Sequence, residues 1–340
     1  MSETGSFTPS STHEYLRQIP APEGPPPRPR YWLHGLLLLA TCFTTLVVGA
    51  RLNFNFQNNL PPFTTGNEHV PFFPIEWTLA DPSRLLLGIP FSAALLIILL
   101  SHEMGHYLLC RYYGVRATLP YFLPAPTLIG TLGAVIRIKA PIRSRAALFD
   151  IGIAGPIAGF AMAVSALGVA ISFSKPMPRG IPIAELQLGY PAIFSLVQHA
   201  LRYIEPNRAV AFLPLTGVYL HPVAVAAWVG MYATALNLLP SGQLDGGHIV
   251  YALAPRAHRA ISWLTVISLV GFGASAYRAD HSNYSWWVWA GLITAMNILT
   301  IRHRQAPDYP AIPASRWALA VLSGAMLIMT FPISPFHVSL

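Results

Sequence analysis

Long runs of apolar residues constrain this chain more than any other feature of its sequence. Hydrophobic residues make up 54% of its 340 residues and charged residues only 10%, whereas about 25% of the residues in an ordinary soluble domain are charged. A soluble globule cannot bury so much apolar surface, and the runs approach the roughly 20 residues that a helix needs to cross a bilayer. The sequence therefore predicts an integral membrane protein.

Hydropathy predicts seven membrane-spanning helices. Lys and Arg are distributed among the connecting segments as the positive-inside rule expects when the N-terminus is cytoplasmic and the C-terminus lies outside. Despite the net charge of +8, nucleic acid is not a predicted partner, because the basic residues flank apolar runs instead of forming one long basic surface. The predicted spans are residues 31–50, 86–110, 146–173, 221–240, 260–277, 285–301 and 316–333.

Two of the connecting segments contain structure of their own. Residues 128–139 combine β-branched residues, glycines and an alternating pattern, which favours short strands over a helix. Residues 191–203, within the long connection 174–220, form an amphipathic segment that we expect at the membrane interface. The predicted fold is an all-α polytopic membrane protein with about seven transmembrane helices and a small membrane-associated β element between spans two and three.

Composition divides the chain into four parts. Residues 1–30 are polar and rich in proline, so they are predicted to form a disordered cytoplasmic tail. Residues 31–85 hold the first transmembrane span and an outer loop, and residues 86–255 form the membrane core that carries the chemistry. Residues 256–340 supply three additional transmembrane helices.

The second predicted span contains an H-E-x-x-H motif, formed by His102, Glu103 and His106. On a helix the i, i+4 spacing places both imidazoles on one face, where they can share a zinc ion while Glu103 activates water as a general base. Ionisable residues inside a membrane are costly and by default functional. We therefore expect a zinc site, the alternative being structural histidines hydrogen-bonded within a helix bundle.

A broken helix in the fourth predicted span offers a third ligand. Residues 237–248 read NLLPSGQLDGGH, and one proline with three glycines disfavours a regular helix. At membrane depth, the unpaired N–H and C=O groups of irregular backbone need hydrogen bonds from protein or from water in a cavity. Asp245 is therefore predicted to be a buried carboxylate on irregular backbone. A catalytic zinc site keeps three protein ligands and one open position. Asp245 completes that set, and His248 is the competing ligand, which we expect to be a polar packing partner instead.

The two motifs together resemble those of the site-2 protease family of intramembrane zinc metalloproteases. That family pairs H-E-x-x-H with N-x-x-P-x-P-x-L-D-G on a later span. Asn237, Pro240 and Asp245 match the second motif, and Gly242 stands where the family often has a second proline. The resemblance covers roughly residues 86–255.

The resemblance implies a role for each matched residue. Asn237 would hold the tetrahedral intermediate or position the substrate. Residues 128–139 would receive an extended substrate by strand addition, the alternative being a packing loop that makes no substrate contact. The implied zinc ligands are His102, His106 and Asp245, and the implied catalytic base is Glu103.

The third predicted span carries glycines at short intervals: Gly152, Gly155 and Gly159. Small residues let helix backbones approach closely in lipid, so we expect this span to pack against the span that carries His102 and His106. Asp150, just before the glycines, is expected to be a helix N-terminal charge stabilised by the helix dipole and not a ligand.

These features predict an intramembrane zinc endopeptidase, with one catalytic Zn²⁺, that hydrolyses peptide bonds in or near transmembrane segments of substrate proteins (regulated intramembrane proteolysis). Two alternatives are less consistent with the sequence. A metal transporter would not require a glutamate beside the first histidine of the H-E-x-x-H motif, which Glu103 provides. A catalytically idle membrane scaffold would be expected to have lost part of that motif, which is complete here. The predicted partners are a transmembrane protein substrate and the lipid bilayer. The predicted location is the inner (cell) membrane of a bacterium, and the sequence leaves the oligomeric state open.

Overall fold

The computed structural model describes residues 30–62, 73–139, 142, 144–178, 186–279, 284–299 and 312–338. The predicted tail, apart from residue 30, lies outside the described residues, as does most of the connection before the last helix. By internal contacts the chain divides into Met1–Tyr31 and Trp32–Leu340.

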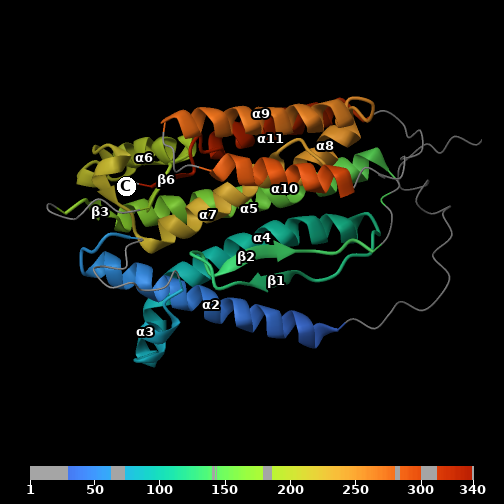
Figure 1. Cartoon of the computed structure of the whole chain (residues 1–340). Helices are drawn as coiled ribbons and strands as arrows, with labels where there is room; N and C mark the ends of the chain where they lie inside the picture. Colours follow the sequence, from blue (N-terminus) through green and yellow to red (C-terminus); the bar gives the residue numbers. More distant parts are fainter. Residues whose placement is uncertain are drawn as a thin grey trace, which may run out of the picture. The chain divides into compact units, whose positions relative to one another are not determined.

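A helix occupies each position at which hydropathy predicts a span (Figure 1). Four segments are long and apolar enough to cross a membrane, namely Tyr31–Gln57, Pro82–Tyr112, Arg145–Phe173 and His258–Arg278. The other three helices are apolar but have only 17, 15 and 16 residues. At about 1.5 Å per residue they are shorter than the roughly 30 Å hydrocarbon core. The protein is therefore mostly helical with four candidate spans, and the count of seven stays a prediction. The helices are α2 (Tyr31–Gln57), α4 (Ile89–Tyr112), α5 (Arg145–Phe173), α7 (Pro222–Leu238), α9 (His258–Ala279), α10 (Ser285–Leu299) and α11 (Ser315–Thr330).

Shorter helices fill the connections. α6 (Ala192–Ile204) covers the amphipathic segment predicted at residues 191–203, with Ile193 and Phe194 buried and Tyr203 exposed. The position of this segment at the membrane interface stays a prediction. The others are α3 (Ile75–Leu79), α8 (Asp245–Leu253) and the 3₁₀ helices η1 (Pro82–Gly88), η2 (Ala209–Ala211) and η3 (Leu215–Gly217).

Helices α4, α5 and α7 pack closely, and glycines make room at two of their contacts. A β carbon built on Gly105 of α4 would lie 2.5 Å from the carbonyl oxygen of Ala154 on α5, so these two backbones approach each other closely. Gly230 of α7 makes room for the side chain of Ile98 on α4, whose Cγ2 would lie 2.5 Å from a β carbon there. Small residues allow helices to pack this closely in lipid. The predicted packing of the third span on the span that carries the two histidines is confirmed.

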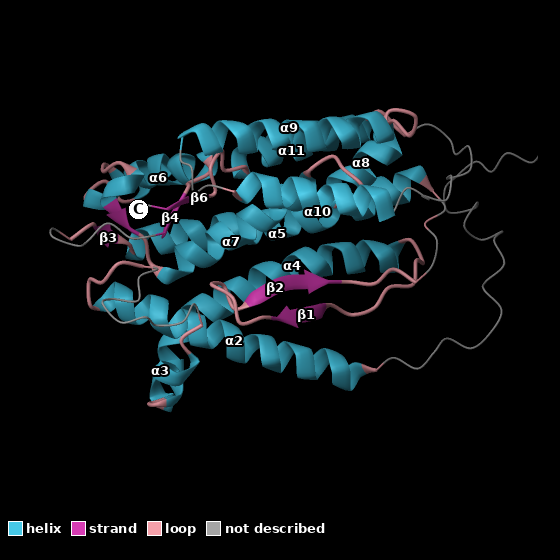
Figure 2. Ribbon diagram, in the orientation of Figure 1, coloured by secondary structure: helices cyan, strands magenta, loops and turns pink. Residues whose placement is uncertain are grey.

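Three two-stranded antiparallel sheets occur among the described residues (Figure 2). β1 (Tyr121–Pro124) pairs with β2 (Thr131–Val135), with Tyr121 opposite Val135. The strand predicted within residues 128–139 is therefore shorter than that range, because Gly130 adopts φ +78° in the turn that joins the two strands. The remaining sheets pair β3 (Lys175–Pro176) with β5 (Val218–Tyr219) and β4 (Leu186–Leu188) with β6 (Phe336–Val338).

The β1–β2 hairpin is attached to α2 along its β1 side. The His34 ring stacks on Tyr121 at a centroid distance of 3.9 Å, and its Nδ1 lies 3.0 Å from the carbonyl oxygen of Pro120. At the turn, the Thr44 hydroxyl donates to the carbonyl oxygen of Gly130 at 2.6 Å. These contacts leave β2 as the strand on the α7 side of the hairpin (Figure 1).

Candidate metal centre

The H-E-x-x-H residues lie well inside α4, and their side chains are buried. His102, Glu103 and His106 are each 7% exposed. The one-turn spacing brings the two imidazoles together, with ring centroids 4.9 Å apart. The helix therefore presents two nitrogen ligands from one buried face.

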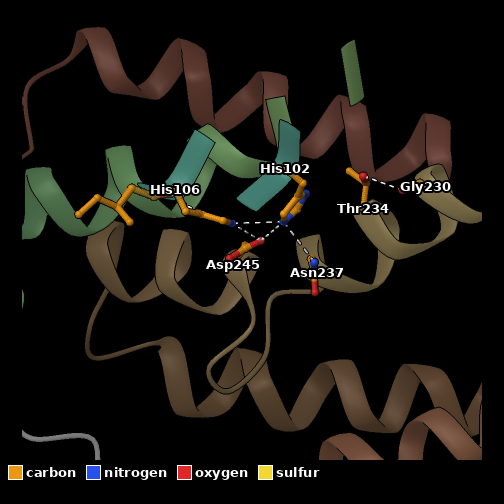
Figure 3. A network of polar contacts seen from close by, with 7 residues as sticks. His102, His106, Gly230, Thr234, Asn237 and Asp245 are labelled. Atoms are coloured by element: carbon orange, nitrogen blue, oxygen red, sulfur yellow. Dashed lines mark hydrogen bonds and ion pairs between the residues drawn. The ribbon is translucent and has the colours of Figure 1, made fainter. Parts of the chain in front are cut away.

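Asp245 reaches the two histidines from the first turn of α8 (Figure 3). Helix α7 ends at Leu238, and the chain then turns through residues 239–244, where Gly242 has a positive φ of 55°. The predicted helix break is confirmed. The prediction that Asp245 lies on irregular backbone is wrong, because Leu244 is the extended N-cap and Asp245 begins the next helix. A carboxylate is electrostatically favoured at this end of a helix.

Three ligand atoms converge on one point. Oδ2 of Asp245 lies 3.2 Å from Nε2 of His102 and 3.3 Å from Nε2 of His106, and the two Nε2 atoms are 3.2 Å apart. Around a tetrahedral zinc ion with bonds of about 2.0–2.2 Å, neighbouring ligand atoms lie about 3.3–3.6 Å apart. The three atoms thus form one nearly equilateral face of such a tetrahedron. This donor set and its spacing fit a zinc ion and leave the fourth position for water or substrate.

A polar contact behind the imidazole of His106 sets the orientation of that ring, and a second contact lies at the ligand atom of His102. Nδ1 of His106 lies 2.7 Å from the carbonyl oxygen of Ile151 on α5. A carbonyl oxygen can only accept, so Nδ1 carries the proton and the lone pair of Nε2 points toward Asp245. The side-chain amide nitrogen of Asn237, at the end of α7, lies 3.3 Å from Nε2 of His102. The structure therefore brings Asn237 to the same centre as the three ligand atoms (Figure 3).

The glycines of α5 make room for the site. A β carbon on Gly155 would lie 2.1 Å from Nε2 of His106, and one on Gly159 would lie 3.0 Å from Cβ and Nδ1 of His102. Gly152 faces α8, where its β carbon would lie 3.3 Å from Cβ of His248. Both imidazoles consequently lie on the bare backbone of α5, which limits how far either ring can turn.

Glu103 lies beside the metal ligands and contacts the hairpin. Its carboxylate accepts a hydrogen bond from the backbone N–H of Ile136, the residue that follows β2. The structure therefore links the predicted catalytic base to the strand predicted to receive substrate. A general base must be held near the water that it deprotonates, and this N–H restrains the carboxylate.

His248 and Asp150 do not join the ligand group. His248 lies one turn after Asp245 and lines a cavity of about 770 Å³ together with Ile136 and Gln243. Asp150 instead forms a two-pronged ion pair with Arg316 of α11, with N–O distances of 2.7 and 2.6 Å. Tyr113 donates a hydrogen bond to the same carboxylate, and burial together with this bond raises the pKa of Tyr113 to about 12. The prediction that Asp150 is a helix N-terminal charge is wrong, because α5 begins at Arg145 and has no acidic residue in its first turn. Its carboxylate is instead neutralised by Arg316 of α11.

Several contributors to the site were not predicted from the sequence. The carbonyl group of Ile151 and the N–H group of Ile136 act through the backbone, which every residue possesses, so no residue pattern marks them. The glycines of α5 were predicted to bring two helices together, but their contact with the imidazole rings was not. Arg316 lies 166 residues from its partner Asp150, too far apart for a sequence pattern to reveal.

Comparisons with known proteins point to one family. Residues 90–273 match the model of peptidase family M50, and this range contains both motifs. Probable zinc metalloprotease EGY1, chloroplastic, from Arabidopsis thaliana is 31% identical over 77% of this chain and 45% of its own length. The protein of the same name from Oryza sativa subsp. japonica is 30% identical over 76% of this chain and 44% of its own length. Probable zinc metalloprotease EGY2, chloroplastic, from Arabidopsis thaliana is 29% identical over 66% of this chain and 39% of its own length. The chain thus spans less than half the length of these relatives.

Proposed function

The chain belongs to peptidase family M50, the site-2 protease family, and on that premise we propose that it is an intramembrane zinc endopeptidase. It hydrolyses peptide bonds in or near transmembrane segments of substrate proteins. The observation that carries the proposal is the position of Asp245, whose carboxylate lies 3.2 and 3.3 Å from the two imidazoles of an H-E-x-x-H motif. That motif lies in a segment apolar enough to cross a membrane.

The proposed zinc ligands are His102, His106 and Asp245. Zinc, when bound, polarises the scissile carbonyl and lowers the pKa of a coordinated water toward about 7. The spacing of the three ligand atoms supports this assignment, and so does the hydrogen bond from His106 to the carbonyl oxygen of Ile151. Relatives named as zinc metalloproteases support the choice of metal.

Glu103 is the proposed general base. Its carboxylate takes a proton from the attacking water and then passes it to the nitrogen of the leaving amine. The N–H of Ile136 helps to hold the carboxylate in place. Asn237 is proposed to donate its side-chain N–H to the carbonyl oxygen of the substrate as negative charge develops there. Its amide nitrogen lies 3.3 Å from His102 Nε2, which supports that role.

The proposed partners are a transmembrane protein substrate and the lipid bilayer. The distribution of Lys and Arg supports a cytoplasmic N-terminus and seven spans. The relatives described above are named as chloroplastic proteins. The four apolar candidate spans support a membrane location, but the names of these relatives give no support to the bacterial cell membrane that the sequence predicts. The proposed division of the chain keeps residues 86–255 as the protease core.

A comparison of membranes tests the proposed function without knowledge of the substrate. Cells that express the wild-type chain and cells that express Glu103→Gln are compared by quantitative membrane proteomics. One or more membrane proteins should accumulate uncut in the variant, with their shortened forms present only in the wild type. Identical membrane proteomes, with both chains inserted at equal levels, would count against proteolysis.

A further inference from the structure

An apolar cavity of about 470 Å³ lies between the β1–β2 hairpin and α7, apart from the metal ligands. We propose that it is a substrate subsite, which accepts a large apolar side chain four to five residues from the scissile bond. The proposal rests on the proposed protease function and identifies a feature of the substrate. The lining includes Thr127, Leu132, Leu188, Val225, Trp228 and Phe336.

The cavity has a rigid aromatic wall. Trp228 is 2% exposed, and its Nε1–H donates to the carbonyl oxygen of Gly189 at 2.8 Å. Its ring stacks on Tyr232 at 5.1 Å and meets Phe336 edge-on at 5.4 Å. Phe336 is in turn fixed opposite Leu188 in the β4–β6 sheet. The wall is therefore formed before any ligand arrives, as expected of a binding pocket.

The volume and lining of the cavity indicate an apolar side chain. A cavity of about 150 Å³ lined by apolar residues already holds a benzene ring, so 470 Å³ has room for a Phe, Leu or Trp side chain. Leu132 of β2 is 71% exposed at the rim, although the opposite wall at Trp228 is buried. An apolar group that leaves water or lipid for this pocket gains contacts with the aromatic wall.

Strand β2 connects the cavity to the catalytic base. β1 pairs with one edge of β2, and among the described residues no strand pairs with the other edge, which faces α7. Thr131 lines the cavity at the start of β2, and Ile136, just past its end, donates its N–H to Glu103. An extended peptide paired with β2 advances about 3.3 Å per residue, as the strand itself does. A substrate whose scissile bond lies near Glu103 therefore reaches the cavity four to five residues away.

The adjoining strand edge favours a peptide over a lipid chain as the occupant. Among the described residues no strand pairs with the edge of β2 that faces α7, so the N–H and C=O groups of that edge can pair with an extended peptide. A lipid acyl chain has no group that can form these hydrogen bonds. The strand edge therefore identifies the occupant as a segment of substrate polypeptide.

The test measures a preference and not an overall rate. Substrates with a single transmembrane segment carry Ala, Leu or Phe at each position from two to seven residues on either side of the cleaved bond. We expect one substituted position, four or five residues from the cleaved bond, to matter most. The substrate with Phe at that position should be cleaved by wild-type protein in proteoliposomes at least about tenfold faster than the substrate with Ala there. Leu132→Trp narrows the cavity and should lower this Phe-to-Ala ratio about tenfold, whereas Leu132→Ala should not lower it. The matched control is Leu39→Trp, since Leu39 is 69% exposed on α2 and does not line the cavity.

Crosslinking supplies a readout that does not depend on cleavage. In the Glu103→Gln variant, a benzoylphenylalanine four or five residues from the scissile bond should crosslink to Trp228 or Val225, and Leu132→Trp should reduce that product. An unchanged preference in Leu132→Trp, or labelling of the cavity by photoreactive lipid chains instead of substrate, would overturn the subsite and leave the protease standing. Failure of wild-type protein to cleave any substrate of the series would overturn both.

Discussion

Gly155 of α5 lies directly against the imidazole ring of His106, with no space for a side chain between them. A β carbon at this glycine would be 2.1 Å from Nε2, the nitrogen that faces Asp245. Pro156 follows within the same helix, so the backbone there has little freedom to move away. The metal centre thus depends on a residue that has no side chain.

This contact predicts that Gly155→Ala displaces the His106 ring and weakens zinc binding. We expect a loss of about 10–100-fold in zinc affinity, the usual effect of disturbing the groups that orient a ligand. Gly168→Ala on the same helix is the matched control, because a β carbon there meets nothing within 4 Å. Zinc titration of both purified variants against a competing chelator measures the difference, and equal affinities would refute the contact.

Asp245→Ala and His248→Ala together test the third ligand. If Asp245 is the ligand, its removal leaves two protein ligands, and zinc should be lost upon dialysis. His248 lies outside the ligand group, so His248→Ala should change zinc affinity by about 10–100-fold at most. The number of zinc ions per chain, measured by mass spectrometry of the metal, distinguishes Asp245 from His248 as the third ligand. Full occupancy in Asp245→Ala combined with loss in His248→Ala would transfer the role to His248.

The Asp150–Arg316 ion pair predicts that α11 stabilises the protease core. Both side chains are about one-fifth exposed, at 20% for Arg316 and 17% for Asp150, so Arg316→Ala should lower the free energy of unfolding by about 1–3 kcal/mol. Arg208→Ala breaks the exposed pair with Glu205 and should cost less than about 1 kcal/mol.

Denaturant unfolding in mixed micelles measures both changes, and the Asp150→Asn, Arg316→Ala double variant completes a cycle that isolates the pair. Equal losses in Arg316→Ala and Arg208→Ala would show that the Asp150–Arg316 pair stabilises the protein no more than an exposed ion pair does.

The distribution of basic residues predicts that residues 111–145 and 302–315 are cytoplasmic. Most of residues 302–315 lie outside the described residues, so the test uses the segment 111–145. In a Cys42→Ser, Cys110→Ser background, a cysteine in place of exposed Arg116 should resist an impermeant thiol reagent added outside. A cysteine in place of exposed Arg208 should react with it. The reverse labelling would overturn the orientation.

The sequence predicts those parts of this protein that depend on local pattern or on membrane physics. Apolar runs predict where helices form because a bilayer accepts backbone only when its polar groups are satisfied internally. The H-E-x-x-H spacing predicts that His102 and His106 share a face because a helix has a fixed period. The helix break after Leu238 is predicted because proline lacks the N–H that a helix needs and glycine has a low helix propensity.

The remaining features arise from contacts between segments far apart in the chain. The pairing of β4 with β6 joins Leu188 to Phe336, and no local pattern marks Leu186–Leu188 or Phe336–Val338 as strands. That Asp245 begins a helix instead of lying in a loop depends on how α8 packs against α5. The orientation of His106 depends on the carbonyl group of Ile151, which no residue type can reveal.

Glu103→Gln tests most directly whether this site hydrolyses peptide bonds with Glu103 as the general base. Gln is nearly isosteric with Glu and can still accept the hydrogen bond from Ile136, but it cannot take a proton from water. Purified wild type and variant are placed in proteoliposomes with a substrate that carries one transmembrane segment, and zinc content and cleavage rate are measured on the same samples. We expect one zinc per chain in both proteins and a cleavage rate lower by about 10²–10⁴-fold in the variant. Cleavage by Glu103→Gln within about tenfold of the wild-type rate, at equal zinc content, would contradict this expectation.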